Sequence, residues 1–247
     1  NTSLTNLKCQ YNQLTSLDVS ANTALTYLAC QDNQLASLDV SANTALTFLN
    51  VEGSNQLTSL DVSSNTALTQ LHCYNNELTS LDVSSNTALN YLSCPDNQLT
   101  SLDVSGATAL TNLGCRSNQL TTLDVSANTA ITDLDCRNNE LTTLDVSNNT
   151  NLDELYCQNN QLTYLNMKNG LTEQVTDFNA TSNSLTCIET LDPDYATANW
   201  TYANENIDAG VTFDVICGAE AQTNWYVATT GSDASGSGTL ASPLSSI

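Results

Sequence analysis

The residues of this chain with reactive side chains recur at fixed intervals. One series of cysteines and one series of aspartates run along the sequence, whereas histidine occurs once, at His72. Thiols and carboxylates can ligate metals, and they can act as nucleophile, acid or base. A zinc site needs side chains that converge on one point, so the placement of each series decides its chemistry. The cysteines of the series are Cys9, Cys30, Cys73, Cys94, Cys115, Cys136 and Cys157.

Both series belong to a 21-residue repeat that reads L-T-x-L-x-C-x-x-N-x-L-T-x-L-D-V-S-x-N-T-A. The cysteines are 21 residues apart except for one step of 43, where Val51 takes the cysteine position and one residue is inserted near Gly53. A self-similar unit of this length predicts a solenoid in which each unit forms one coil. An asparagine column has no gap, at Asn12, Asn33, Asn55, Asn76, Asn97, Asn118, Asn139, Asn160 and Asn183.

Both halves of the unit alternate between apolar and polar residues in the manner of strands. In the first half Leu28 and Cys30 flank Ala29, and in the second Leu17 and Val19 flank Asp18. This period of two predicts extended segments with one buried face on both sides of each coil. We therefore predict a mainly β solenoid of about nine coils over residues 1–183. Similar spacing on its two sides favours weak curvature.

The repeat resembles a known family. Its first half matches the leucine-rich repeat, L-x-x-L-x-L-x-x-N/C-x-L, with cysteine mostly at the third leucine. Its second half, L-T-x-L-D-V-S, looks like a short bacterial class found in secreted and surface proteins, including internalin-like ones. The resemblance implies a secreted or cell-surface module for adhesion or recognition that binds a protein or a polysaccharide. It also implies that the variable residues around the first strand face the ligand.

Aromatic residues gather among these variable positions, over the second to the fifth coil. They are Tyr27, Phe48, His72, Tyr74 and Tyr91. Exposed aromatics suit protein hot spots or stacking on sugar rings. The alternative is that they brace one another across neighbouring strands.

A second group of variable residues is charged. Asp133, Asp135 and Glu154 surround Arg116 and Arg137, the only two arginines in the chain. We take both arginines and Tyr156 as further candidate ligand contacts. The alternative is that the arginines relieve repulsion among the carboxylates, because surface ion pairs are common.

The cysteine and aspartate columns have structural interpretations. One thiol per coil, in a line, predicts buried free cysteines that act as small apolar residues. The aspartates stand about 5 Å apart and could recruit calcium, with Asp82 and Asp103, or Asp133 and Asp135, as ligands. The alternative is that each aspartate accepts hydrogen bonds from nearby Ser, Thr or backbone N–H groups. No other cofactor is expected. The aspartate column comprises Asp18, Asp39, Asp61, Asp82, Asp103, Asp124 and Asp145, and it ends at Asn166.

The composition narrows the function classes. The chain has 247 residues, with 4 Lys+Arg against 26 Asp+Glu and a formal charge of −22. Nucleic acids and anionic membrane surfaces need clustered basic residues, so both are excluded as partners. No apolar run approaches the roughly 18 residues of a membrane span. A single histidine on a flat open sheet predicts a protein that is not an enzyme, and we expect a monomer.

The end of the chain departs from the repeat. We expect residues 184–218 to form a cap that closes the last coil around Trp200. The segment resembles the cysteine-bounded cap that follows such bacterial repeats, and Cys187 and Cys217 could join in a disulfide there. Residues 219–247 are expected to be a linker and the truncated start of a further domain. This stretch resembles the opening of bacterial right-handed parallel β-helix domains, which are often carbohydrate-active, so a targeting or spacer module of a larger surface enzyme is the alternative function.

Overall fold

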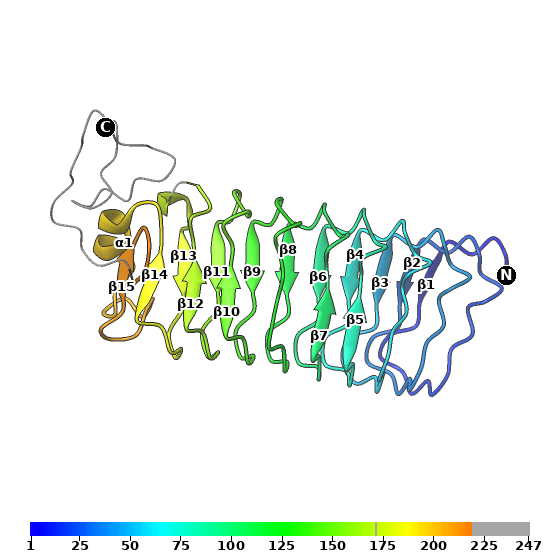
Figure 1. The fold of residues 1–247 in the computed structure, drawn as a ribbon. Helices are drawn as coiled ribbons and strands as arrows, with labels where there is room; N and C mark the ends of the chain where they lie inside the picture. The colour runs from blue at the N-terminus through cyan, green and yellow to red at the C-terminus, as the bar shows by residue number, and fades with distance from the viewer. Residues whose placement is uncertain (171, 219–247) are drawn as a thin grey trace, which may run out of the picture. The chain divides into compact units, whose positions relative to one another are not determined.

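The structure, a computed structural model, describes residues 1–170 and 172–218. Each repeat forms one coil, and the coils stack side by side from the N-terminus to the cap (Figure 1). The predicted mainly β leucine-rich repeat solenoid is confirmed. The expected linker and further domain at 219–247 lie outside the described residues. Within the described ranges, no helix combines the length and the apolar character that a membrane span requires.

The first half of each unit contributes one short strand to a parallel sheet. The sheet has nine strands in the order β1-β2-β3-β4-β6-β8-β9-β11-β13. Residues at the same repeat position are partners in neighbouring strands, as Tyr27 is with Phe48 and Leu28 with Leu49. Every repeat position therefore becomes a column of side chains. The strands are β1 Asn6–Lys8, β2 Tyr27–Ala29, β3 Phe48–Asn50, β4 Gln70–His72, β6 Tyr91–Ser93, β8 Asn112–Gly114, β9 Asp133–Asp135, β11 Glu154–Tyr156 and β13 Asp177–Asn179.

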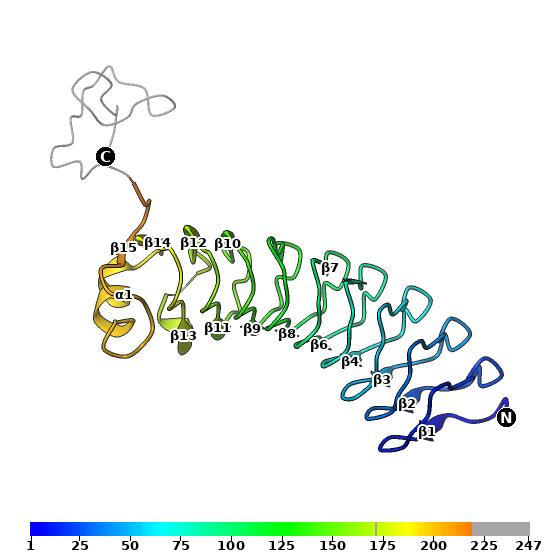
Figure 2. The same ribbon diagram turned by 90° about the horizontal axis from the view of Figure 1, so that it is seen from below.

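The second half of the unit forms hydrogen-bonded strand pairs only in some of the coils. A two-stranded sheet joins β5 and β7, and a four-stranded sheet has the order β10-β12-β14-β15. The row of coils bends, with the nine-stranded sheet on its inner side (Figure 2). Paired strands hold their coils about 4.8 Å apart, whereas the less paired side can spread. The strands are β5 Ser80–Asp82, β7 Ser101–Asp103, β10 Thr143–Asp145, β12 Tyr164–Asn166, β14 Cys187–Glu189 and β15 Thr212–Asp214.

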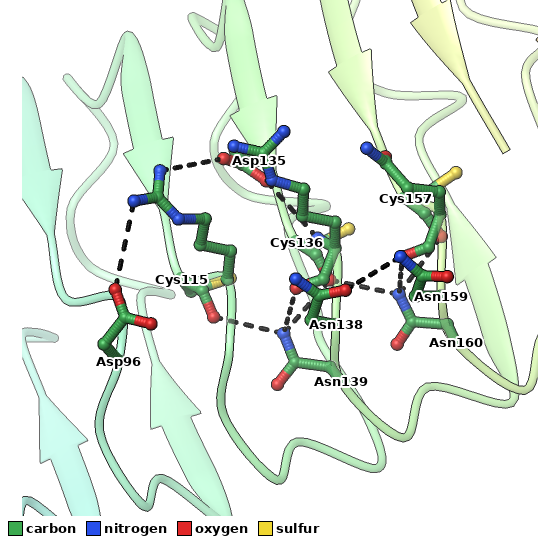
Figure 3. A network of polar contacts seen from close by, with 12 residues as sticks. Asp96, Cys115, Asp135, Cys136, Asn138, Asn139, Cys157, Asn159 and Asn160 are labelled. Atoms are coloured by element: carbon green, nitrogen blue, oxygen red, sulfur yellow. Dashed lines mark hydrogen bonds and ion pairs between the residues drawn. The ribbon is translucent and has the colours of Figure 1, made fainter. Parts of the chain in front are cut away.

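The core between the two sides is built from columns. Leucines and valines of successive coils are almost fully buried, and so are the cysteines from Cys30 to Cys157. Cys9, in the first coil, is partly exposed. Asparagines tie the coils together: Asn139 Nδ2 donates to the carbonyl oxygens of Cys115 and Cys136 at 3.1 and 3.0 Å (Figure 3). Its Oδ1 accepts the backbone N–H of Leu120 at 3.1 Å. These bonds satisfy buried backbone groups that the turn leaves open.

The last coil is closed by a short helical segment. A 3-10 turn, η1 Thr172–Gln174, comes first in the chain, and helix α1 Pro193–Asn199 follows later. Asp192 caps the N-terminus of α1, because its carboxylate accepts the N–H of Tyr195 at 2.9 Å. Trp200 is buried, with its ring centroid 4.8 Å from that of Phe178 and 5.8 Å from that of Phe213. Residues Asn1–Val215 form one compact unit. Tryptophan packing thus covers the apolar end of the solenoid.

Candidate ligand-binding face

The variable columns lie on the outward face of the nine-stranded sheet. In β6, Leu92 points into the core, whereas Tyr91 and Ser93 on either side are exposed or half-buried. The same alternation holds in the neighbouring strands, since side chains of a strand alternate between its two faces. The candidate residues of the first and third strand positions therefore share one surface.

Four of the predicted aromatic residues form a continuous row across β2, β3, β4 and β6. The ring centroids of Tyr27 and Phe48 are 4.3 Å apart with planes 2° from parallel. Those of Phe48 and His72 are 5.3 Å apart, and those of His72 and Tyr91 are 4.9 Å apart. We call Tyr27, Phe48, His72 and Tyr91 the aromatic row. Lys8 covers its first ring, with Nζ 5.2 Å from the Tyr27 centroid.

Tyr74, the fifth predicted aromatic, is not part of this row. It follows the buried Cys73 and is exposed at the end of the strand. Among the described residues, it makes no ring contact with the aromatic row. The negative charge of Glu52, together with partial burial and Asp32, raises the pKa of its hydroxyl. Tyr74 thus belongs to the edge of the face, beside two carboxylates.

His72 lies within the row as a half-buried ring. Burial lowers its pKa, and Glu52, whose Oε2 is 3.9 Å from Nδ1, raises it less. The ring is therefore mainly neutral at pH 7. Cys73 is fully buried on the opposite side of the strand. A cysteine–histidine pair for nucleophilic catalysis is absent from this site, because such a pair needs the two side chains within hydrogen-bond reach.

The charged candidates gather around one carboxylate. Arg116 Nη1 is 3.7 Å and Arg137 Nε is 3.3 Å from oxygens of Asp135, and Arg116 also reaches Asp96 at 3.9 Å (Figure 3). Burial raises the pKa of Asp135, while both arginines lower it. The guanidinium of Arg137 also lies 5.7 Å from the ring centroid of Tyr156. Both arginines therefore form ion pairs with carboxylates of this chain, which supports a role in relieving repulsion, and their contact with a ligand stays a prediction.

The neighbouring carboxylates have no basic partner among the residues the structure describes. Asp133 accepts hydrogen bonds from Asn112 Nδ2 at 2.7 Å and Thr132 Oγ1 at 2.5 Å. Burial, followed by the charges of Asp133 and Asp177, raises the pKa of Glu154. Tyr156 donates its hydroxyl to Asp177 at 2.6 Å. This part of the face keeps an excess of negative charge.

A hollow separates the aromatic row from the charged group. It has a volume of about 250 Å³ and is lined by Tyr91, Arg116, Asp133, Asp135, Glu154 and Tyr156, among others. Its floor is β8, where Gly114 takes a column position that carries Asp135 one coil later. A Cβ on Gly114 would meet Leu92 O and Pro95 Cγ no closer than 3.9 Å. Backbone geometry does not require this glycine, and its missing side chain makes the hollow.

The calcium candidates are divided between the two sides of the solenoid. Asp82 and Asp103 lie in β5 and β7, on the side away from the aromatic row, and accept the backbone N–H of Ser84 at 2.8 Å and of Ser105 at 2.9 Å. Side-chain and backbone hydrogen bonds from Ser105 lower the pKa of Asp103. In the described ranges, no group of three or more His, Cys, Asp or Glu side chains is placed to hold a metal ion. The local hydrogen bonds support the structural interpretation of the column.

Sequence reasoning missed Lys8, Glu52, Gly114 and Asp177. Lys8, Glu52 and Asp177 each interact with a side chain of a different column in a neighbouring coil. Gly114 matters because it has no side chain. Lys8, for example, is a partner of Ala29 in the register but reaches the ring of Tyr27. A map of the columns in register, with diagonal neighbours included, is the signal that finds them.

Comparisons with known proteins support this architecture. A family model described as the LVIVD repeat matches residues 15–51 and 136–156, less than half of the chain. No curated protein matches the sequence. The functional domain of InlJ from Listeria monocytogenes is similar in structure, with a TM-score of 0.71 and 38% identity over 87% of this chain and 45% of that chain. A leucine-rich repeat protein from Leptospira interrogans has a TM-score of 0.65 and 28% identity, over 74% of this chain and 50% of its own.

A further similar structure is YopM, a leucine-rich effector protein from Yersinia pestis, with a TM-score of 0.60 and 25% identity over 73% of this chain and 49% of that chain. The chain thus spans half or less of the length of these three proteins. The InlJ domain is described as including a cysteine ladder, and the present chain carries a column of seven unpaired cysteines. The repeat, the fold and these neighbours identify the chain as a bacterial leucine-rich repeat protein of the internalin-like class.

Proposed function

We propose that the chain is a non-catalytic recognition module that binds its ligand through the outward face of the nine-stranded sheet. The observation that carries this proposal is the aromatic row. The repeat scaffold requires leucine, cysteine and asparagine at its core columns, and it requires nothing aromatic at Tyr27, Phe48 or Tyr91. Aromatic side chains on a rigid surface are the usual centres of binding energy.

The similarity to leucine-rich repeat proteins supports a role in protein interaction. Adhesion at a cell surface, after secretion, is the setting that this class of repeat suggests. Between the two ligand classes left open by the sequence, a protein is favoured over a polysaccharide. The stacked rings of Tyr27 and Phe48 cover each other, so they offer edges rather than open faces to a sugar ring.

The test is a binding assay with a paired substitution on the face. Tyr74→Ala together with Tyr91→Ala should weaken adhesion to cells or to immobilised host proteins by at least about tenfold. Tyr202→Ala is the matched control, because Tyr202 is an exposed tyrosine in the cap. Far-UV circular dichroism should be unchanged in all variants. Adhesion of the double variant equal to that of the unmodified chain contradicts the proposal and favours a spacer.

A further inference from the structure

We propose that the hollow over Gly114 is a subsite for one basic side chain, arginine or lysine, of a protein ligand. This inference rests on the proposed function of the face and assigns a ligand chemistry to one position on it. Three features of the hollow carry the inference: an open ring face, an unfilled floor and an unbalanced charge.

The open ring face belongs to Tyr91. In the aromatic row, Tyr27 and Phe48 cover each other, and Lys8 covers the other side of Tyr27. His72 covers one side of Tyr91. On its other side, Tyr91 lines the hollow, and its partner in the register is Asn112, whose amide is directed to Asp133 instead. The row therefore ends in a tyrosine ring that faces an unfilled space.

The two ends of the aromatic row are chemically parallel. At the first end, the Lys8 ammonium group stands 5.2 Å from the Tyr27 centroid. A cation over an aromatic face is held by the negative charge of the ring face. At the second end, Tyr91 lines the same hollow as Asp133 and Asp135, and among the described residues no cation lies over its ring. A side chain from a partner can complete this end as Lys8 completes the other.

The floor of the hollow leaves room for such a side chain. Gly114 and Ser93 are small residues at adjacent positions of one column, between His72 on one side and Asp135 on the other. Since a Cβ would fit at Gly114 without a close contact, the space is a property of the residue type and not of the backbone. A guanidinium or ammonium group on its alkyl chain fits a groove of about 250 Å³.

The charge of the lining selects a cation. Three carboxylates, Asp133, Asp135 and Glu154, line the hollow with the guanidinium of Arg116. With Arg137, which lies 3.3 Å from Asp135, the sum is 2 − 3 = −1. Arg116 and Arg137 both pair with Asp135, so Asp133 and Glu154 remain uncompensated. Burial, followed by the negative charges of Asp133 and Asp177, raises the pKa of Glu154, and a bound cation relieves the repulsion among these charges. The formal charge of −22 steers basic partners toward the chain as a whole.

The experiment uses the full chain and three small probes. Nα-acetyl-arginine N-methylamide supplies the charged side chain, and the citrulline analogue supplies the same shape with a neutral urea group. Methyl pyranosides supply a neutral sugar ring. Amide signals of Gly114 and Asp135 in ¹⁵N NMR spectra report occupancy. We expect saturable shifts with the arginine probe in the millimolar range, binding at least about tenfold weaker with citrulline, and loss of affinity in added salt.

Two variants locate the site. Gly114→Leu should abolish the arginine response by filling the hollow. Glu154→Gln keeps the shape and should weaken arginine about tenfold while leaving citrulline unchanged. If Gly114→Leu lowers the thermal midpoint, its loss of binding does not count, and the result with Glu154→Gln alone tests the subsite. Equal affinity for arginine and citrulline, shifts caused by a pyranoside instead, or no response to any probe at 50 mM each overturn the subsite. If the Tyr74/Tyr91 variant still loses adhesion in that case, the proposed function stands and only the subsite falls.

Discussion

The ring of Tyr27 lies flat against the ring of Phe48, with centroids 4.3 Å apart and planes 2° from parallel. Each ring in this arrangement covers one face of the other, so the side chains of the aromatic row support one another. Bracing and binding were alternatives at the level of sequence. In the structure, the rings of the row support one another along its length, and the row ends at Tyr91, which is exposed and lines the hollow. Because these side chains are already held in place, less conformational entropy is lost when a ligand binds to them.

The stacked pair should be energetically coupled. We expect a double-mutant cycle of Tyr27→Ala and Phe48→Ala to give a coupling free energy of about 1 kcal/mol, because stacked aromatic pairs contribute beyond their buried area. Urea denaturation of the four proteins measures it. Tyr27→Ala combined with Tyr202→Ala is the control, since Tyr202 lies in the cap. Additivity of the Tyr27 and Phe48 effects within about 0.3 kcal/mol would show that the rings do not support each other.

The sequence predicts which residues share the face and leaves their contacts undetermined. Alternation within a strand places Tyr91 outward and Leu92 inward, and the 21-residue period places Tyr27 next to Phe48. Both inferences need only local geometry. The contact of Phe48 with His72 and the convergence of Arg116 and Arg137 on Asp135 cross between columns. Such contacts depend on side-chain length and rotamer, which the repeat pattern does not specify.

The aspartate column was ambiguous for a different reason. Regular carboxylates suit either calcium or local hydrogen bonds, and the period is the same for both. The serine two residues after each aspartate favours local hydrogen bonds, because its N–H lies within reach of the carboxylate in a turn, as Ser84 and Asp82 show. The columns show that Gly114 lacks a side chain, but the hollow also depends on how the side chains of Tyr91 and Arg116 are placed around it, and the repeat pattern does not specify that.

Two glycines of successive repeat units should respond differently to substitution by alanine. At Gly106 a Cβ would lie 1.7 Å from the carbonyl oxygen of Ser84, whereas at Gly114 it would lie 3.9 Å from its neighbours. The next residue, Ala107, stands where the adjacent coils carry Asn86 and Asn128, so this turn packs closer to the preceding coil. Gly106→Ala should cost about 3 kcal/mol through a forced backbone shift.

Gly114→Ala is the matched control for that substitution. It should leave the free energy of unfolding within about 0.5 kcal/mol, because the added methyl group makes only ordinary van der Waals contacts at 3.9 Å. Denaturation midpoints of the two variants make the comparison. If Gly106→Ala lowers the free energy of unfolding no more than Gly114→Ala does, the close approach of Gly106 to Ser84 does not persist in solution.

The cysteines should fall into three classes of reactivity. Burial raises the pKa of Cys30, Cys94 and Cys157 to about 12, so at pH 8 only about one thiol in ten thousand is the reactive thiolate. Cys9 is partly exposed and should be alkylated first in the folded protein. Cys187 and Cys217 are disulfide-bonded, and we expect them to be joined to each other.

Thiol counting separates these classes. Iodoacetamide should label Cys9 in the native chain, seven cysteines after denaturation without reduction, and all nine after reduction, since nine are present and seven are free. Mass spectrometry of the labelled peptides identifies each site. Nine labelled cysteines before reduction would exclude the disulfide, and rapid native labelling of Cys94 or Cys115 would contradict a closed core.

The aspartate column makes stability depend on salt and acid, and it provides the test for calcium. Hydrogen bonds from serine lower the pKa of Asp103 and Asp124. A carboxylate whose pKa is lower in the folded chain stabilises the fold above its unfolded pKa of about 4, and this stability is lost as the pH falls through the folded value. We therefore expect the melting temperature to fall in acid below about pH 4.

At neutral pH, repulsion along the column should lower the melting temperature in low salt, and NaCl should restore it by screening. Asp103→Asn keeps an acceptor for the N–H of Ser105, as Asn166 does for Lys168 at 3.1 Å, and removes one charge. It should be at least as stable as the unmodified chain, whereas Asp103→Ala loses the hydrogen bond and should be about 1 kcal/mol less stable.

CaCl₂ and NaCl at equal ionic strength should give the same melting curve, because each carboxylate already has a local donor. A higher midpoint in CaCl₂ that Asp82→Asn and Asp103→Asn remove would instead establish a calcium site in the column. If the gain survives both substitutions, Asp133, Asp135 and Glu154 are the next residues to exchange.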